Sequence, residues 1–219
     1  MAGLGLERIP SSQDLDYFNV NRLGMEEVVK QSLYDFQTYP TAGATQFSFF
    51  QVPIGQSSKT KADTNMTLAG ALPNPQKFLA QSVEVYFFPG GEINRNFAAA
   101  GDQEGWSDDI EAIYHGIMHL EMTIGSKPYL TEAPLVRMPP KTYIKGNFAI
   151  AGTYAATAGN VLDMSAATGR PYFLTPPLMI PSMQNFTVQI NAPTAIATPS
   201  GLDGRIGVVL DGLLYRLSQ

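Results

Sequence analysis

The chain has 219 residues, a formal net charge of −5 and no cysteine, which excludes disulfides, thiol catalysis and zinc–thiolate sites. Hydrophobic residues make up 44% of the chain and charged residues only 15%, whereas an average domain carries roughly 25% charged residues. A surface this poor in charge is suited to being covered by neighbouring molecules.

The first 43 residues predict an N-terminal arm with one amphipathic helix. Four apolar residues recur there at helical spacing: Met25, Val29, Leu33 and Phe36. A proline at position 40 and a glycine at position 43 end the pattern. Two interpretations stay open for this stripe, because it could form a subunit interface on a neighbouring copy or pack on its own domain.

Residues 44–219 predict a single all-β domain, because their apolar residues alternate with polar ones, as in antiparallel strands with one face on a core. The alternation is strong over residues 78–88, 117–124, 143–154, 184–192 and 205–216, and weaker over 46–54, 64–69 and 171–175. About eight strands joined by long connections rich in proline and glycine favour a jelly roll. The expected inward-facing residues include Val85, Leu120, Phe148, Val188 and Val208.

One short helix is expected between two of these strands, over residues 106–114. Ser107 is its candidate N-cap, and Asp108 and Asp109 fall in the first turn, where the helix dipole favours negative charge.

No catalytic, metal or cofactor site is predicted. His115 and His119 lack the glutamate of a zinc-protease helix, because the segment between them reads Gly-Ile-Met. An acidic cluster could hold calcium between subunits, although no EF-hand order is present: Asp102, Glu104, Asp108, Asp109 and Glu111. A carboxylate pair for glycoside hydrolysis stays open. With Trp106 the only tryptophan, stacking on a sugar is not favoured.

Direct binding of nucleic acid is not expected. Residues 1–40 hold three basic and six acidic residues, and nucleic-acid binders concentrate lysine and arginine instead. No window approaches 18 consecutive apolar residues and no signal peptide is evident, so neither a membrane span nor secretion is expected. The absence of cysteine fits a chain made in a reducing cytoplasm.

Three segments carry a resemblance to a known family. Residues 120–139 read LEMTIGSKPYLTEAPLVRMP, residues 52–56 and 64–67 read VPIGQ and TNMT, and residues 208–216 read VVLDGLLYR. Together they resemble the jelly-roll major capsid proteins of tailless icosahedral bacterial viruses, many of which contain a membrane. The resemblance covers about residues 46–219 and does not extend to the arm.

The resemblance implies a non-enzymatic coat protein that self-assembles as trimers, pentamers or hexameric capsomers in the virion, after synthesis in the bacterial cytoplasm. Minor capsid proteins and an internal membrane are further partners that it implies. With 219 residues, the chain is too short for two full rolls. Two other functions stay open: a jelly-roll binding module, such as a virion spike or carbohydrate-binding domain, and a small β-sandwich hydrolase.

Overall fold

The structure is a computed structural model that describes residues 26–90, 104–140, 143–149, 161–167 and 169–217. The side chains of residues 26, 104–108, 143–149 and 161–167 lie outside this description. In chain order the elements are β1 (Glu26–Tyr39), β2 (Gln46–Phe49), β3 (Lys77–Phe88), α2 (Glu104–Tyr114), β4 (His119–Ile124), β5 (Lys127–Glu132), the 3₁₀ turn η1 (Leu135–Arg137), β6 (Tyr143–Ala149), β7 (Val161–Ala167), β8 (Tyr172–Ile180), β9 (Phe186–Asn191) and β10 (Gly204–Leu217).

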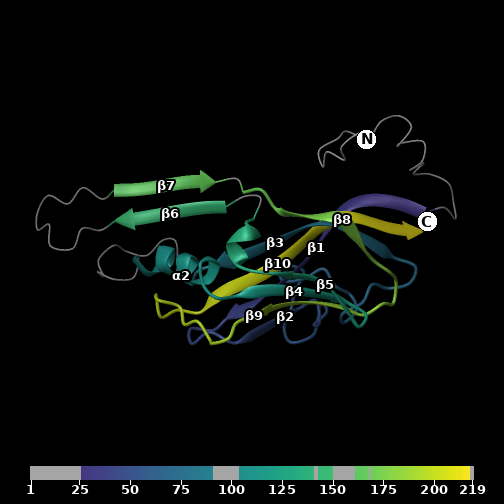
Figure 1. The fold of residues 1–219 in the computed structure, drawn as a ribbon, viewed down its shortest axis with the longest axis horizontal. Coiled ribbons are helices and arrows are strands. Elements are labelled where there is room, and N and C mark those ends of the chain that lie inside the picture. Colours follow the sequence, from purple (N-terminus) through teal and green to yellow (C-terminus); the bar gives the residue numbers. More distant parts are fainter. Residues whose placement is uncertain (1–25, 91–103, 141–142, 150–160, 168, 218–219) are drawn as a thin grey trace, which may run out of the picture.

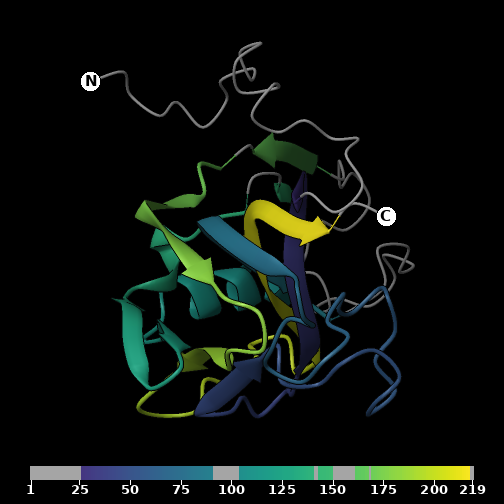
Figure 2. The ribbon, with the colours of Figure 1, turned by 90° about the vertical axis from the view of Figure 1, so that its right-hand side faces the viewer.

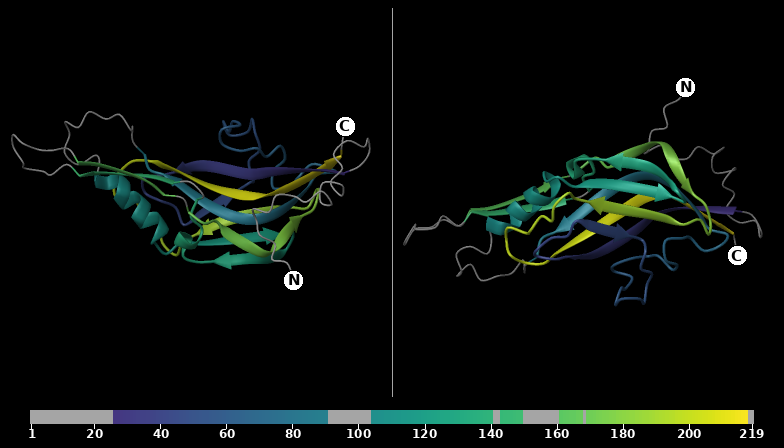
Figure 3. Two further views of the ribbon diagram at one scale, coloured as in Figure 1. Left: turned by 90° about the horizontal axis from the view of Figure 1, so that it is seen from above. Right: turned by 60° about the horizontal axis from the view of Figure 1, so that its bottom comes forward.

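Two antiparallel four-stranded sheets form a sandwich, which confirms the all-β prediction. One sheet has the strand order β1-β10-β3-β8 and the other β2-β9-β4-β5. Seen from above, the purple, yellow and blue strands of the first sheet lie over the teal strands of the second (Figure 3, left), and the end-on view separates the same layers (Figure 2).

The strands β6 and β7 form a separate antiparallel ribbon. This ribbon extends away from one end of the sandwich, opposite the end where β10 finishes (Figure 1). The helix α2 lies beneath it and contacts β6, β3 and η1.

The core lies between the two sheets and follows the alternation in the sequence. The expected inward residues Val85, Leu120, Val188 and Val208 are all 0% exposed, and the side chain of Phe148 lies outside the described residues. Aromatic rings join the layers: Tyr39 of β1 stacks on Phe47 of β2 at 4.9 Å and meets Phe87 of β3 edge-on at 5.4 Å. Offset and edge-on pairs of this kind add specific geometry to the apolar burial.

In the first part of β3 the even-numbered side chains face the core, and in the last part the odd-numbered ones do. The alternation over residues 78–88 predicts that Leu79 faces inward with Val85 and Phe87, yet Phe78 is the fully buried residue and Leu79 is only half-buried. The cause is a register shift against β8 between Ala80 and Ser82. Such an irregularity adds one residue to the strand, so the alternation of inward and outward side chains is reversed beyond it.

The expected N-terminal helix is wrong over the described part of the arm. Residues 26–39 form the strand β1, which pairs with β10 without a register shift from Glu26↔Leu217 to Tyr39↔Gly204. The spacing of Val29, Leu33 and Phe36 fits a helix, but long-range pairing with β10 decides the outcome. The strand is therefore part of the sandwich.

Three smaller expectations also change. The helix α2 begins at Glu104, so Ser107 is inside it and is not its N-cap. Residues 64–69 form no strand and take part only in isolated bridges, Asp35↔Thr64 and Leu68↔Ala71. The strands β5 and β7 were not anticipated from the sequence.

Candidate functional site

A buried ion pair fixes the connection between β2 and β3 to strand β1. Asp35 projects from β1 into the core and is 0% exposed. Its Oδ1 lies 2.5 Å from Nζ of Lys59, whose side chain is 12% exposed, and its Oδ2 accepts the main-chain N–H of Phe50 at 2.6 Å. These partners satisfy a carboxylate that would otherwise be costly to bury.

Burial raises the pKa of Asp35 above its usual value of 3.8. The hydrogen bonds from Lys59, Phe50 and Thr64 and the positive charge of Lys59 act in the opposite direction without cancelling that rise. Loss of hydration therefore dominates the electrostatics of this carboxyl group.

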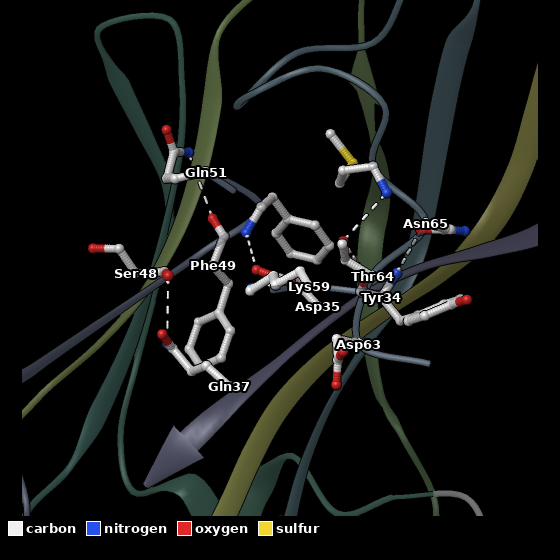
Figure 4. A network of polar contacts seen from close by, with 12 residues as sticks. Tyr34, Asp35, Gln37, Ser48, Phe49, Gln51, Lys59, Asp63, Thr64 and Asn65 are labelled. Carbon is white, nitrogen blue, oxygen red and sulfur yellow. Dashed lines mark hydrogen bonds and ion pairs between the residues drawn. The ribbon is translucent and has the colours of Figure 1, made fainter. Parts of the chain in front are cut away.

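The same connection covers part of the outer edge of β1 (Figure 4). The N–H of Tyr34 donates to Oδ1 of Asn65 at 3.1 Å, and the N–H of Phe36 donates to the carbonyl oxygen of Asp63 at 2.7 Å. Asp63 also accepts a hydrogen bond from Arg205 of β10 at 2.8 Å. The long connection is thus tied to both β1 and β10, which places it at one edge of the sheet.

The outer face of this sheet carries a cluster of aromatic side chains, here called the aromatic face: Tyr34 and Phe36 of β1 with Tyr86 and Phe88 of β3. The ring of Phe36 lies 6.3 Å from that of Tyr34, 6.2 Å from Tyr86 and 6.0 Å from Phe88, measured between centroids. The guanidinium of Arg205 lies over Phe36 at 4.6 Å, a cation–π distance. Phe88 is 45% exposed, so the cluster reaches the surface.

Next to the aromatic face lies a shallow depression of about 480 Å³. Its lining is mainly polar: Lys30, Gln31, Ser32, Glu84, Tyr86, Val209 and Asp211. The hydroxyl of Tyr86 donates to Oε2 of Glu84 at 2.9 Å, and the hydroxyl of Ser32 donates to Asp211. The first bond joins two side chains of the same strand, β3, and the second joins β1 to β10.

The predicted interface residues do not form one stripe. Met25 lies outside the described residues, and in a strand Val29 and Leu33 share one face while Phe36 belongs to the other. Leu33 is 3% exposed and belongs to the core, whereas Phe36 belongs to the aromatic face. The sequence analysis did not predict the aromatic face. A signal was present, because Tyr34 and Phe36, like Tyr86 and Phe88, are two residues apart and lie on the same face of a strand.

The candidate metal ligands whose side chains the structure describes do not converge. His119 pairs with Glu121 at 3.3 Å, and His115 is exposed just after α2. In the acidic cluster Asp102 lies outside the described residues, and the side chains of Glu104 and Asp108 are not described. Asp109 is buried and accepts both the N–H and the hydroxyl of Ser200, at 2.8 and 2.6 Å. Within the described ranges, no group of three or more potential ligands converges.

Comparison with known proteins gives no match: no family model, curated protein or solved structure is similar to this chain at a significant level. No helix in the described part of the chain has the length and apolar character needed to cross a membrane.

Proposed function

We propose that the sandwich is a jelly roll and that the chain is a non-enzymatic coat subunit that self-assembles into the icosahedral shell of a tailless bacterial virus. The observation that carries this proposal is the pattern of strand pairing. In a jelly roll of eight strands, an antiparallel ribbon is wound so that the first strand pairs with the last, the second with the seventh, the third with the sixth and the fourth with the fifth.

The pairing in this chain fits that scheme when the β6–β7 ribbon is treated as an insertion. The eight remaining strands pair as β1 with β10, β2 with β9, β3 with β8 and β4 with β5. The two further pairs, β10 with β3 and β4 with β9, join these ribbons into sheets. The insertion then falls between the fifth and sixth strands of the roll.

A fold alone does not define a function, because jelly rolls also occur in lectins and cupins. Two further features support a coat subunit. The first is the low share of charged residues, 15%, which leaves much of the surface neutral and suited to burial between copies. The second is a set of well-exposed apolar side chains on strands and connections, among them Phe88, Ile117, Tyr129 and Met183 at 45–64%. Self-association in a closed shell would cover such side chains.

The aromatic face supports a second candidate, a virion spike or carbohydrate-binding module. Aromatic side chains at a surface can stack on a sugar ring, and Phe88 is the most accessible of the four. Phe36 is already covered in part by Arg205, which reduces the ring area available to a ligand.

The test is the size of the particle formed by the purified full chain, measured by light scattering and electron microscopy. Shells or large capsomers are expected for a coat subunit. A stable monomer that binds an oligosaccharide on a glycan panel, and loses that binding on Phe88→Ala, would support the binding module and overturn the coat proposal. Phe173→Ala, at a half-buried aromatic of β8, is the matched control.

A further inference from the structure

The outer edge of strand β1 has a covered half and an open half. Over residues 32–36 the outward main-chain groups are bonded by the β2–β3 connection, including the carbonyl of Ser32, which accepts from Nδ2 of Asn65 at 2.7 Å. Over residues 26–31, no residue that the structure describes hydrogen bonds to the outward main-chain groups. The described part of the chain therefore covers one half of this edge and leaves the main-chain groups of the other half without a partner among the described residues.

The direction of the free groups follows from the register. The pairing of β1 with β10 has no shift along its whole length, so the main-chain groups of alternate residues point the same way. Tyr34 and Phe36 direct their N–H groups away from β10. Val28 and Lys30, at even positions like these, direct theirs outward too. An edge of this kind is a template for a further strand.

We infer that the open half of β1 pairs antiparallel with the same segment of a second copy, around a two-fold axis at Val28. Only the even-numbered residues of β1 direct their main-chain N–H and C=O groups outward. In the contact, even-numbered residues of the two copies must therefore lie opposite one another. In this register Val28 lies opposite Val28 of the second copy. Residue 26, a glutamate, lies opposite Lys30 of the second copy, and the same pair recurs on the other side of the axis.

Charge complementarity selects this register. Moving the axis by one residue towards the N-terminus places residue 26 opposite Val28, which is uncharged, so the glutamate of each copy faces no opposite charge. Moving it to Lys30 places two lysines opposite each other, which is unfavourable for like charges at cross-strand positions. The axis at Val28 is the register in which every charged residue with outward groups faces an opposite charge.

The result is a symmetric contact that continues the β1-β10-β3-β8 sheet from one copy into the next. The overlap is short, so the surface area that it buries is small compared with the roughly 1,200–2,000 Å² buried in a stable interface. The inference thus deepens the proposed function and rests on it, because other contacts of a shell must help to hold the copies together.

The first experiment uses the full chain with a single thiol. The native sequence has no cysteine, so Val28→Cys introduces the only one. Directly opposed residues in a hydrogen-bonded antiparallel pair have Cα atoms about 5.5 Å apart, within the range for a disulfide. Mild oxidation should trap a covalent dimer of Val28→Cys at least about tenfold faster than of Thr38→Cys, an exposed control on the same strand far from the axis. Equal rates for the two variants, or no dimer of Val28→Cys, overturn the inference.

The second experiment tests the register by exchanging charges in the Val28→Cys background. Glu26→Lys alone places two lysines opposite each other on both sides of the axis, and Lys30→Glu alone places two glutamates there. Each should slow dimer formation about three- to tenfold. A mixture of the two variants restores opposite charges on both sides, so the mixed dimer should form at the parent rate. Failure of the mixture to recover that rate overturns the register.

The outcomes separate this contact from the proposed function. Shells that form without any Val28→Cys dimer would retain the coat proposal and overturn the contact. A charge-dependent dimer of a chain that forms no larger particle would retain the contact and overturn the coat proposal.

Discussion

The ring of Phe36 lies directly over the backbone of Gly207, so closely that a β-carbon added to this glycine would lie 2.0 Å from Cδ1 of the ring. Gly207 is opposite Phe36 in the β1–β10 register and opposite Tyr86 in the β10–β3 register. The glycine thus lets the aromatic side chains of the two flanking strands approach each other across β10. The aromatic face depends on this one position.

Replacing this glycine should therefore displace the ring. Gly207→Ala is expected to destabilise the chain by about 1–3 kcal/mol, as for overpacking at a tight contact. In a Phe36→Ala background the same substitution should cost much less, because the clashing ring is gone. Chemical denaturation of the parent, the two single variants and the double variant measures this coupling. Additive effects of the two substitutions would show that the contact is not the reason for the glycine.

The buried ion pair predicts a strong effect at Lys59. Lys59→Met leaves the Asp35 carboxylate in the core without its cation and should cost about 3–5 kcal/mol at pH 7. Lys61→Met, at an exposed lysine of the same connection, is the matched control and should stay within about 0.5 kcal/mol of the parent. Thermal and urea denaturation of both variants compare the two sites. An equally small effect at Lys59 would contradict a structural role for the pair.

The loss of stability caused by Lys59→Met should depend on pH, because the pKa of Asp35 is raised. A carboxyl group whose folded-state pKa is raised binds its proton more tightly in the folded chain than in the unfolded one. Its contribution to the free energy of unfolding is therefore fully present below pH 3.8 and is lost as the pH rises through the folded-state pKa. Removing the Lys59 charge raises that pKa further. The difference in stability between parent and Lys59→Met should hence shrink as the pH falls from 7 towards 4. A difference that does not change with pH would mean that the carboxyl group is not the source of the cost.

The position of β1 predicts how the chain responds to truncation. Deleting residues 1–40 removes Leu33, Asp35 and Tyr39, which are 0–3% exposed, and exposes the edge of β10. This deletion should abolish the cooperative thermal transition. Deleting residues 1–25 keeps the whole of β1 and should preserve that transition. A folded, cooperative product of the longer deletion would contradict the place of β1 in the sandwich.

The strands β4 and β9 could be predicted from the sequence because their inward residues are all apolar. Met118, Leu120 and Met122 in and before β4, like Phe186, Val188 and Ile190 in β9, alternate cleanly and are at most 1% exposed. Period-two patterns of this kind report a half-buried strand directly. Each of the five strongest alternating segments contains a strand of the structure, and residues 150–154 of one segment lie outside the described residues.

The strand β1 could not be predicted from alternation, because its inward positions include polar residues whose hydrogen-bonding partners are distant in the sequence. Asp35 meets Lys59, and Nε2 of Gln37 donates to the carbonyl of Ser48 at 3.4 Å. Its outward positions include Tyr34 and Phe36, so apolar residues occur on both faces. Neither the partner of Asp35 nor the pairing with β10 can be read from local spacing.

The strand β5 was missed for a related reason. Only Leu130 is buried among its six residues, and Pro128 interrupts the pattern. A short edge strand with one inward anchor carries almost no periodic signal. The aromatic face likewise needs the register of three strands to bring its side chains together, although each pair two residues apart was visible in the sequence.

The last prediction concerns the genome that a coat would enclose. In a chain with net charge −5 the acidic residues outnumber the basic ones, whereas nucleic-acid binding relies on cations that release counterions from phosphates. In the described part of the chain, Arg137, Arg205 and Arg216 are already paired with carboxylates. We expect the purified full chain to show no measurable binding to a DNA duplex in fluorescence anisotropy at low salt, where electrostatic association is strongest. The inner face of a shell would then contact a membrane or a separate basic protein. Tight binding that weakens steeply as salt rises would contradict this, because each phosphate contact adds about −0.9 to the slope of log K against log salt concentration.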